Sequence, residues 1–321
     1  MFANYKYFLA IAEELNLRKA ADRLYVSHQN LSKYLQRLEA ELGVRLCNRK
    51  PIFSLTPEGE LLASSLRDIE LTEQGFRDRL SEMIDEAGHE IHLGTTEGRF
   101  RILIPDLLGE FHRSFPSVYL RITSADSPRL CRMVENNQLD IMVANASEDY
   151  PKNFACSEVL NEHIYLVISD NMMMKYFPDT YPDCKEALRA GADLREFQAV
   201  PFSMNLPGFR SHIMVKRHAE RLGIELNCIH VSSHPDLHHI MSARDYAASF
   251  CLTMYLPKLL KLNEECGGIL NVFPIKDMKE TNPVVIAWLK KRTFSSYAYE
   301  FIGLVRRQCM TYAKYDKLFM P

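Results

Sequence analysis

The chain has 321 residues, of which 47% are hydrophobic and 25% are charged, and its formal net charge at pH 7 is -2. This length predicts about two domains with sizeable apolar cores, and the near-neutral charge excludes a protein that coats nucleic acid over its whole surface. Neither a signal-peptide segment nor an uncharged apolar run of about 18 residues is present, so we expect a cytoplasmic protein without a membrane span.

The first 59 residues differ in charge from the rest of the chain. They carry nine Lys and Arg residues against six Asp and Glu residues, a net charge of +3, whereas the whole chain is slightly acidic. A basic head on a neutral body is typical of a protein that contacts DNA through one small domain.

Two helices joined by a tight turn are predicted in this basic segment. Asn16 is expected to cap a helix at 17–24, and Ser27 is expected to cap a second helix at 28–42. Four leucines form an apolar stripe on the second helix: Leu31, Leu35, Leu38 and Leu42. The pattern indicates a helix-turn-helix, whose second helix lies in the DNA major groove.

The polar face opposite the leucines is expected to contact DNA. Gln29 can pair with adenine through two hydrogen bonds, and Lys33 can bind guanine or phosphate. Arg18 and Arg37 are expected at phosphates, which position a protein without reading sequence. An ordinary solvated helix face is the alternative. The predicted DNA-binding residues, including two from the segment that follows, are Arg18, Ser27, His28, Gln29, Asn30, Ser32, Lys33, Gln36, Arg37, Arg49 and Lys50.

The segment after Gly43 predicts a β-hairpin, or wing. Two short apolar segments, 44–49 and 52–55, flank Lys50 and so place cations at the tip of the hairpin. Thr56 is expected to cap a further helix, with Pro57 at the tolerated first helical position. Residues 1–57 are therefore predicted to be a winged helix-turn-helix, a helical domain with a small β wing.

This order of residues resembles the winged helix of LysR-type transcriptional regulators. The resemblance covers nearly every position from Tyr7 to Gly59, in "YFLAIAEELNLRKAADRLYVSHQNLSKYLQRLEAELGVRL" and "LTPEGE". Cys47 and Asn48 stand where the family usually has Phe and Glu, and the wing is one residue shorter than the common pattern. The resemblance therefore implies the major-groove contact more directly than a minor-groove contact by the wing.

Residues 58–88 predict a long linker helix that dimerises. Apolar residues recur in alternating steps of four and three, as in a coiled-coil seam interrupted at Glu73. The predicted dimerisation residues are Leu62, Leu66, Ile69, Phe76, Leu80 and Met83. Packing of this stripe onto its own domain is the alternative. We expect a homodimer, or a homotetramer as a pair of dimers, bound to double-stranded inverted-repeat operator DNA.

Residues 89–321 predict an α/β body. Strands at 90–94, 118–124 and 139–145 alternate with helices at 98–116 and 127–138, an order that implies a parallel sheet with helices on its faces. The pattern continues more loosely, with strands at 163–169, 199–204, 226–233, 269–275 and 283–291, and helices at 210–223, 234–243 and 295–308. Ligands of such sheets lie beyond the carboxyl ends of the strands.

The body resembles the LysR-type effector-binding domain, a periplasmic-binding-protein-like fold of two α/β lobes. The resemblance implies a first lobe at 89–161 and 268–307, a second lobe at 162–267, and a ligand cleft between them. The residues that it places in the cleft are Thr95, Thr96, Glu97, Arg99, Ser124, Asp126, Ser127, Phe202, Ser203, Met204, Ser232, Ser233 and Ser249. Hydroxyls at helix N-termini suit an anion, the acids Glu97 and Asp126 suit an amine-bearing or zwitterionic metabolite, and each Ser or Thr can be a simple helix cap.

The resemblance implies a transcriptional regulator whose DNA binding or activation responds to a small-molecule effector, with RNA polymerase as a further partner. No catalytic motif, cofactor fingerprint or C-x-x-C pair is visible, so we expect neither an enzyme nor a cofactor. His234 and His238, four residues apart, lack a third committed ligand, so no metal is expected. A redox-responsive regulator that uses cysteine thiols, and a solute-binding or enzymatic α/β protein with an unrelated head, are the alternatives.

Overall fold

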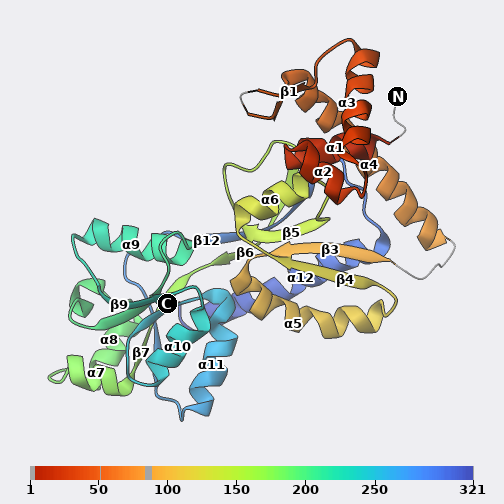
Figure 1. The fold of residues 1–321 in the computed structure, drawn as a ribbon. Coiled ribbons are helices and arrows are strands. Elements are labelled where there is room, and N and C mark those ends of the chain that lie inside the picture. The colour runs from red at the N-terminus through yellow and green to blue at the C-terminus, as the bar shows by residue number, and fades with distance from the viewer. Residues whose placement is uncertain (1–3, 51, 84–88, 321) are drawn as a thin grey trace.

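The computed structural model describes residues 4–50, 52–83 and 89–320. Figure 1 shows an N-terminal head, a long helix α4 (Pro57–Met83) and a body of two α/β lobes, which is the predicted fold class. In the described ranges, no helix combines the length and the apolar character needed to cross a lipid bilayer.

The head contains α1 (Tyr5–Glu14), α2 (Leu17–Arg23), α3 (His28–Leu42) and a hairpin of β1 (Cys47–Asn48) and β2 (Ser54–Leu55). Its helices start where the capping residues predicted. The Asn16 side-chain oxygen accepts hydrogen bonds from the backbone N–H groups of Arg18 and Lys19, and Ser27 Oγ accepts one from the N–H of Asn30 at 3.2 Å.

The leucine stripe of α3 holds the head together. Leu31 and Leu35 are fully buried and Leu38 is 5% exposed, in one core with the small residues Ala20 and Ala21 of α2. Small side chains on α2 let the two helices approach closely, and burial of each leucine contributes about 1.5–3 kcal/mol.

The first three turns of α4 belong to the head rather than to a free linker. The helix has 27 residues, a length of about 40 Å at 1.5 Å per residue. Leu66 is only 2% exposed because it packs with Ala63 in the core of the head, and Leu62 is half-buried beside them. The assignment of Leu66 to the dimerisation surface is therefore wrong, and the domain boundary predicted at residue 57 lies too early.

A second face of α4 packs on the body of the same chain. Leu71 is 4% exposed, in one apolar cluster with Leu130 and Val134 of the body. A Cβ atom on Gly75 would lie 2.4 Å from the Thr293 hydroxyl, so only glycine permits this close approach. Lys291 also pairs with Asp68 of α4 at 2.6 Å.

Lobe I is built on a five-stranded sheet of order β4-β3-β5-β12-β6. Its elements are β3 (Glu90–Thr95), α5 (Glu97–Ser114), β4 (Tyr119–Ser124), α6 (Ser127–Glu135), β5 (Ile141–Asn145), β6 (Phe154–Glu162), β12 (Asn282–Leu289) and α12 (Ser296–Asp316). β3 runs parallel to β4 and β5, as the strand-helix alternation predicted, whereas β12 is antiparallel to β5 and β6. Helices α5 and α12 cover one face of the sheet, and α6 covers the face toward α4 (Figure 1).

Lobe II contains two smaller sheets. Strands β10, β7 and β11 form an antiparallel sheet, and β8 and β9 are a parallel pair. The elements are β7 (Ile164–Ser169), α7 (Asp170–Tyr176), α8 (Cys184–Arg189), η1 (Leu194–Phe197), β8 (Pro201–Asn205), α9 (Arg210–Leu222), β9 (Asn227–Ser232), α10 (Pro235–Ala243), β10 (Ser249–Leu252), η2 (Thr253–Tyr255), α11 (Leu256–Glu265) and β11 (Leu270–Pro274).

The chain crosses between the lobes twice. The first crossing lies between β6 and β7, at His163, close to the predicted boundary. The return crossing lies between Pro274 and Asn282, because β11 pairs with β7 in lobe II, so the predicted start of the return segment at residue 268 is wrong. Lobe I also extends past residue 307: α12 reaches Asp316, whose carboxylate accepts a hydrogen bond from Tyr165 at 2.6 Å.

Candidate functional site

The predicted DNA-binding residues are accessible on the surface of the head. Ten of the eleven are exposed and Ser32 is half-buried. Helix α3 lies on the side of the head away from the two lobes (Figure 1), so nothing in the described part of the chain covers this face. The face that carries Gln29, Lys33 and Gln36 is therefore free to enter a groove about 12 Å wide.

One exposed aromatic residue on this side of the head was not predicted. Tyr25 is 97% exposed and has a φ of 54°, in the turn that joins α2 to α3. Tyr25 comes three residues before His28, the first residue of α3. The sequence signal was the shortness of this turn, which pushes its one large residue into solvent.

A cavity of about 530 Å³ lies between the two lobes. This is the size range of small-molecule sites, and the cavity is named the effector cleft below. From lobe I it is lined by the residues that follow β3 and β4, and from lobe II by the start of α9. Six of the thirteen predicted effector-binding residues line it: Thr96, Glu97, Arg99, Ser124, Asp126 and Ser127.

Four of the other predicted residues lie inside the lobes instead. Thr95 and Ser203 are fully buried, with hydroxyls bonded to the carbonyl of Val143 at 3.1 Å and to His238 Nδ1 at 2.6 Å. Ser249 bonds to another serine in the same lobe, and Phe202 stacks on Phe250. These polar groups are satisfied within their lobes and are not available to a ligand.

The remaining three predictions also miss the cleft. Met204 is 6% exposed in the core of lobe II, and Ser232 Oγ accepts a hydrogen bond from the N–H of His234 at 3.2 Å. Ser233 does not line the cavity. For Met204 the physical reason is strand length: β8 continues to Asn205, one residue past the predicted end, and it is Asn205 that reaches the cleft.

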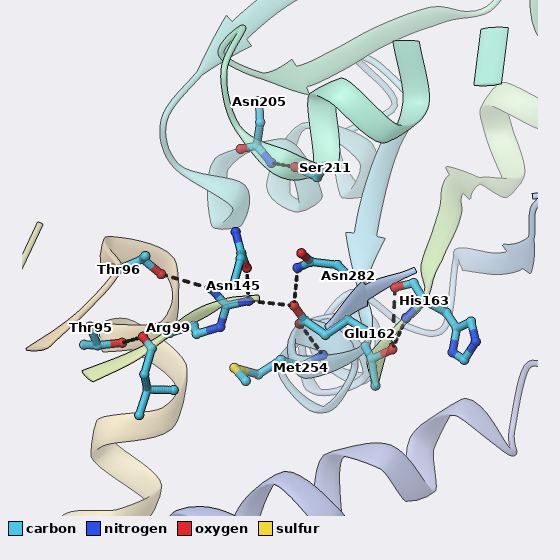
Figure 2. A network of polar contacts seen from close by, with 12 residues as sticks. Thr95, Thr96, Arg99, Asn145, Glu162, His163, Asn205, Ser211, Met254 and Asn282 are labelled. Carbon is cyan, nitrogen blue, oxygen red and sulfur yellow. Dashed lines mark hydrogen bonds and ion pairs between the residues drawn. The ribbon is translucent and has the colours of Figure 1, made fainter. Parts of the chain in front are cut away.

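A buried ion pair forms the floor of the cleft. Arg99 is 7% exposed and Glu162 is 1% exposed, and Arg99 Nη2 donates to Glu162 Oε2 at 2.9 Å. The guanidinium also donates to Asn145 Oδ1 at 2.5 Å and to Thr96 Oγ1 at 3.2 Å. Asn282, the first residue of β12, donates to the same carboxylate at 2.7 Å. The end of β6 and the start of β12, where the chain leaves and re-enters lobe I, therefore meet at one point (Figure 2).

The environment sets the charge of the cleft carboxylates. Burial raises the pKa of Glu162 above its usual value, and the adjacent Arg99 guanidinium opposes this rise. At the mouth of the cleft, the Ser124 hydroxyl donates to Glu97 at 2.9 Å and, with Arg101, lowers the pKa of that carboxyl. Asp126 is the N-cap of α6 and accepts from the N–H of Arg129 at 2.8 Å.

The cleft also contains polar residues that were not predicted as ligand contacts. They are Asn145, Glu162, Asn205, Arg210, Ser211, Tyr255 and Asn282. Asn145 had a usable signal, since it ends a strand of the predicted parallel sheet. Glu162 and Asn282 are 120 residues apart in sequence, and no local pattern predicts that their side chains meet.

His234 and His238 do not converge on a common point. His238 is buried and bonded to Ser203, whereas His234 is exposed at the start of α10. Burial lowers the pKa of His238 to about 4, with His239 and His230 adding to the effect, and burial also lowers the pKa of His239 to about 4. These two imidazoles are neutral packing groups at pH 7.

The two buried histidines make the protein sensitive to acid. An unfolded chain binds protons at these residues near pH 6.5 and the folded chain only near pH 4, so stability is complete above pH 6.5 and falls as the pH drops toward 4. The wild type is expected to lose unfolding free energy between pH 7.5 and pH 5, and the variant His239→Phe is expected to lose about 2 kcal/mol less over the same range. Urea denaturation at the two pH values measures the difference. The matched control, His234→Phe on the surface, should keep the wild-type pH slope; an unchanged slope in H239F would contradict the assignment.

A head with an exposed reading helix, joined by α4 to a body with a ligand-sized cleft, defines a ligand-responsive DNA-binding protein. Two family models match the chain: "Bacterial regulatory helix-turn-helix protein, lysR family" at residues 2–60, and "LysR substrate binding domain" at residues 85–310. The chain belongs to the LysR family of bacterial transcriptional regulators.

Individual relatives agree with this membership. The chain is 24% identical over 310 residues to the uncharacterized HTH-type transcriptional regulator YcgK of Bacillus subtilis, a match covering 94% of this chain and 92% of that protein. It is 29% identical over 181 residues to the HTH-type transcriptional regulator CysB of Burkholderia cenocepacia, covering 54% of this chain and 56% of CysB.

Solved structures share the whole architecture. ArgP from Mycobacterium tuberculosis aligns with a TM-score of 0.64 at 16% identity, covering 95% of both chains. A full-length OxyR variant from Pseudomonas aeruginosa aligns with a TM-score of 0.61 at 19% identity, covering 94% of this chain and 92% of that one. This similarity concerns the fold: head, long helix and two-lobed body.

Proposed function

We propose that this LysR-family regulator binds inverted-repeat operator DNA as a homodimer, or as a homotetramer made of two dimers, and responds to a metabolite in the effector cleft. The observation that carries the proposal is the two-sided α3, whose leucines are buried while Gln29, Lys33 and Gln36 are exposed. Two such helices in a dimer would lie about 34–36 Å apart, one turn of DNA. RNA polymerase would be the partner through which bound protein changes transcription.

The DNA-binding face can be tested with two substitutions that differ in mechanism. Gln29→Ala is expected to reduce discrimination at one base position by about 1–3 kcal/mol, because a bidentate base contact is lost. Arg18→Ala is expected to weaken all sequences alike and to lower the salt dependence by about one counterion, because a phosphate contact is lost. Gel-shift titrations on operators selected from random duplexes, at several salt concentrations, measure both.

Two results would count against this assignment. If both variants bound every selected sequence like the wild type, the polar face of α3 would not be the DNA contact. If Gln29→Ala weakened all sequences uniformly, its side chain would contact phosphate rather than a base. Glu41→Ala, on the last turn of the same helix, is the control and should retain the wild-type base preference.

The dimer interface of the proposal uses a third face of α4. Ile69, Phe76, Leu80 and Met83, the dimer stripe, are 36%, 64%, 44% and 84% exposed. At 100° per residue these four lie within about 60° of each other, on the side of the helix away from Leu71 and Gly75. An exposed apolar stripe of this kind on a long helix, here interrupted at Glu73, is typical of an interface with a second copy.

One helix connects the effector cleft with the head. Ser127, at the start of α6, lines the cleft. In the turn after the end of α6, the Asn137 amide donates to the Arg67 carbonyl at 3.0 Å and to Glu70 at 3.1 Å on α4, and Gln138 donates to Glu13 of α1 at 3.4 Å. A ligand that moves the start of α6 would therefore change how α4 and α1 are held, and with them the spacing of the two reading helices.

The other functions considered have less support. The matched relatives are transcriptional regulators, and we propose no catalytic activity. For redox sensing, burial raises the pKa of Cys47 and Cys309 to about 12 and that of Cys131 to about 11, which leaves little reactive thiolate at these three residues. Counting free thiols before and after peroxide separates this alternative from metabolite sensing. We propose that the protein acts in the cytoplasm, because a bacterial helix-turn-helix regulator needs access to chromosomal DNA.

A further inference from the structure

Four of the eleven buried polar atoms that lack a partner among the described residues belong to residues lining the effector cleft. Arg99 Nε, the Tyr255 hydroxyl, Asn282 Oδ1 and Asn205 Oδ1 are each buried and have no hydrogen-bond partner among the described residues, and all four residues line the cavity. Arg99, Tyr255 and Asn282 are 7%, 6% and 1% exposed. Buried polar groups are nearly always hydrogen-bonded in folded proteins, so four such atoms around one cavity indicate a polar occupant.

The four atoms divide into donors and acceptors. Arg99 Nε–H can only donate, and the Tyr255 hydroxyl can donate. The Asn282 amide nitrogen donates to the Glu162 carboxylate at 2.7 Å, which leaves its oxygen as an acceptor without a partner among the described residues. The Asn205 amide nitrogen donates to Ser211 at 2.7 Å, so its oxygen is also an acceptor. A matching ligand needs at least one acceptor group and at least one donor group.

Two uncapped helix ends favour a carboxylate as the acceptor group. Helix α5 follows Thr96 and helix α9 follows Phe209, and neither of these N-cap residues makes a side-chain hydrogen bond to the helix. Their first turns, including Gly98 and Ser211, line the cleft from opposite lobes. Free N–H groups and the positive end of each helix dipole stabilise an anion, and they act together with the unpaired Nε–H of Arg99.

The charged side chains of the cleft favour a cation as the donor group. Arg99 is paired with Glu162, Arg101 with Glu97, and Arg210 with Glu280 at 3.2 Å. Asp126 adds a carboxylate whose described bond is to a backbone N–H. A second negative group on the ligand would gain nothing here, whereas an ammonium can bind the amide oxygens and be attracted by Asp126.

We propose that the effector is a small zwitterion of the amino-acid type. Its carboxylate binds Arg99 Nε–H and the Tyr255 hydroxyl near the helix ends, and its ammonium binds the oxygens of Asn282 and Asn205. Since Asn205 belongs to lobe II and Arg99 to lobe I (Figure 2), such a ligand contacts both lobes at once. A Cβ atom on Gly98 would lie 2.6 Å from the Tyr255 hydroxyl, so a larger residue at this position would crowd the hydroxyl. This inference rests on the proposed effector function of the same cleft.

The ligand class is tested by calorimetry and thermal shift on the purified full-length chain. The probes are the common L-amino acids at millimolar concentration, each with its 2-hydroxy acid and its decarboxylated amine as matched analogues. At least one amino acid is expected to bind, and each of its analogues is expected to bind at least about tenfold more weakly, because each lacks one charged hydrogen-bonding group. The proposal is overturned if no amino acid binds, or if a simple acid or amine binds as tightly.

Two variants assign the binding to the named atoms. Tyr255→Phe is expected to weaken the amino acid about tenfold without lowering the melting temperature of the unliganded protein, because its hydroxyl has no partner there. Arg99→Lys keeps a cation opposite Glu162 but lacks the Nε–H and should also weaken binding. Tyr246→Phe, at a 63% exposed tyrosine of lobe II, is the matched control and should bind like the wild type. Unchanged affinity in both cleft variants overturns the assignment.

Gel shifts with operator DNA separate this inference from the function on which it rests. If the wild type binds operator DNA and a ligand other than a zwitterion alters that binding, the ligand class is wrong and the effector function stands. If the wild type fails to bind any selected operator, the proposed function itself is wrong.

Discussion

Glutamates at Phe76 and Leu80 together are expected to convert the dimer to monomers and to weaken operator binding at least about a hundredfold. Both side chains lie in the exposed dimer stripe of α4 and point away from the body of their own chain. In a dimer they would face the same residues of the partner, so four carboxylates would be buried close together. A monomer binds one half-site and loses the gain of about 10²–10⁴ that two linked sites provide.

Sedimentation velocity measures the assembly, and gel shifts compare a full operator with a single half-site. The double substitution Phe76→Leu and Leu80→Ile keeps the stripe apolar and should remain dimeric. Half-site binding by the glutamate variant should be unchanged, because α3 and its core are distant from these positions in sequence and fold. A glutamate variant that stays dimeric would exclude this stripe as the interface.

Replacing Glu162 with Leu is expected to lower the free energy of unfolding by about 3–5 kcal/mol. The substitution leaves the Arg99 guanidinium buried without a counter-charge, and an uncompensated buried charge costs this much. It also removes the acceptor of the Asn282 amide. Urea denaturation followed by circular dichroism measures the change, and the same variant should lose the ligand response because the floor of the cleft is disrupted.

The double variant R99M/E162L provides the critical comparison. It removes both charges and should recover most of the lost stability, because two apolar side chains of similar volume can replace a buried ion pair. Glu97→Gln breaks the exposed pair with Arg101 and should cost less than about 1 kcal/mol. If E162L and E97Q lowered the free energy of unfolding by the same small amount, the buried pair would contribute no more to stability than the exposed pair.

Features that depend on residues close together in the sequence could be predicted from it. The caps at Asn16 and Ser27, the leucine stripe of α3 and the wing all follow from residues a few positions apart, and each is present. The lobe I side of the cleft was also predictable, because the carboxyl ends of parallel strands gather at one edge of a sheet. Thr96 and Ser124 reach the cleft for this reason.

Features that depend on contacts between distant segments could not be predicted from the sequence. The heptad pattern of α4 marks Leu66 as apolar but does not say whether the head or a second copy covers it, and the head does. In lobe II, β8 continues to Asn205. Ser203 points into the lobe, where it bonds to His238, and Asn205 lines the cleft instead. Glu162 and Asn282 meet only because both crossings pass the same point, a property of topology rather than of either segment.

The contact of Asn137 with α4 has a consequence for hybrid regulators. A chimera that joined this sensing body to a foreign reading head could still recognise its metabolite, since every residue of the cleft belongs to the body. Under the proposed coupling, its DNA binding would not respond to the metabolite unless the graft also carried the part of α4 around Arg67, Glu70 and Gly75 that contacts the body. Recognition of the metabolite and the response to it therefore depend on different segments of this chain. A working hybrid needs a matched contact between α4 and the turn after α6, as well as an intact cleft and reading helix.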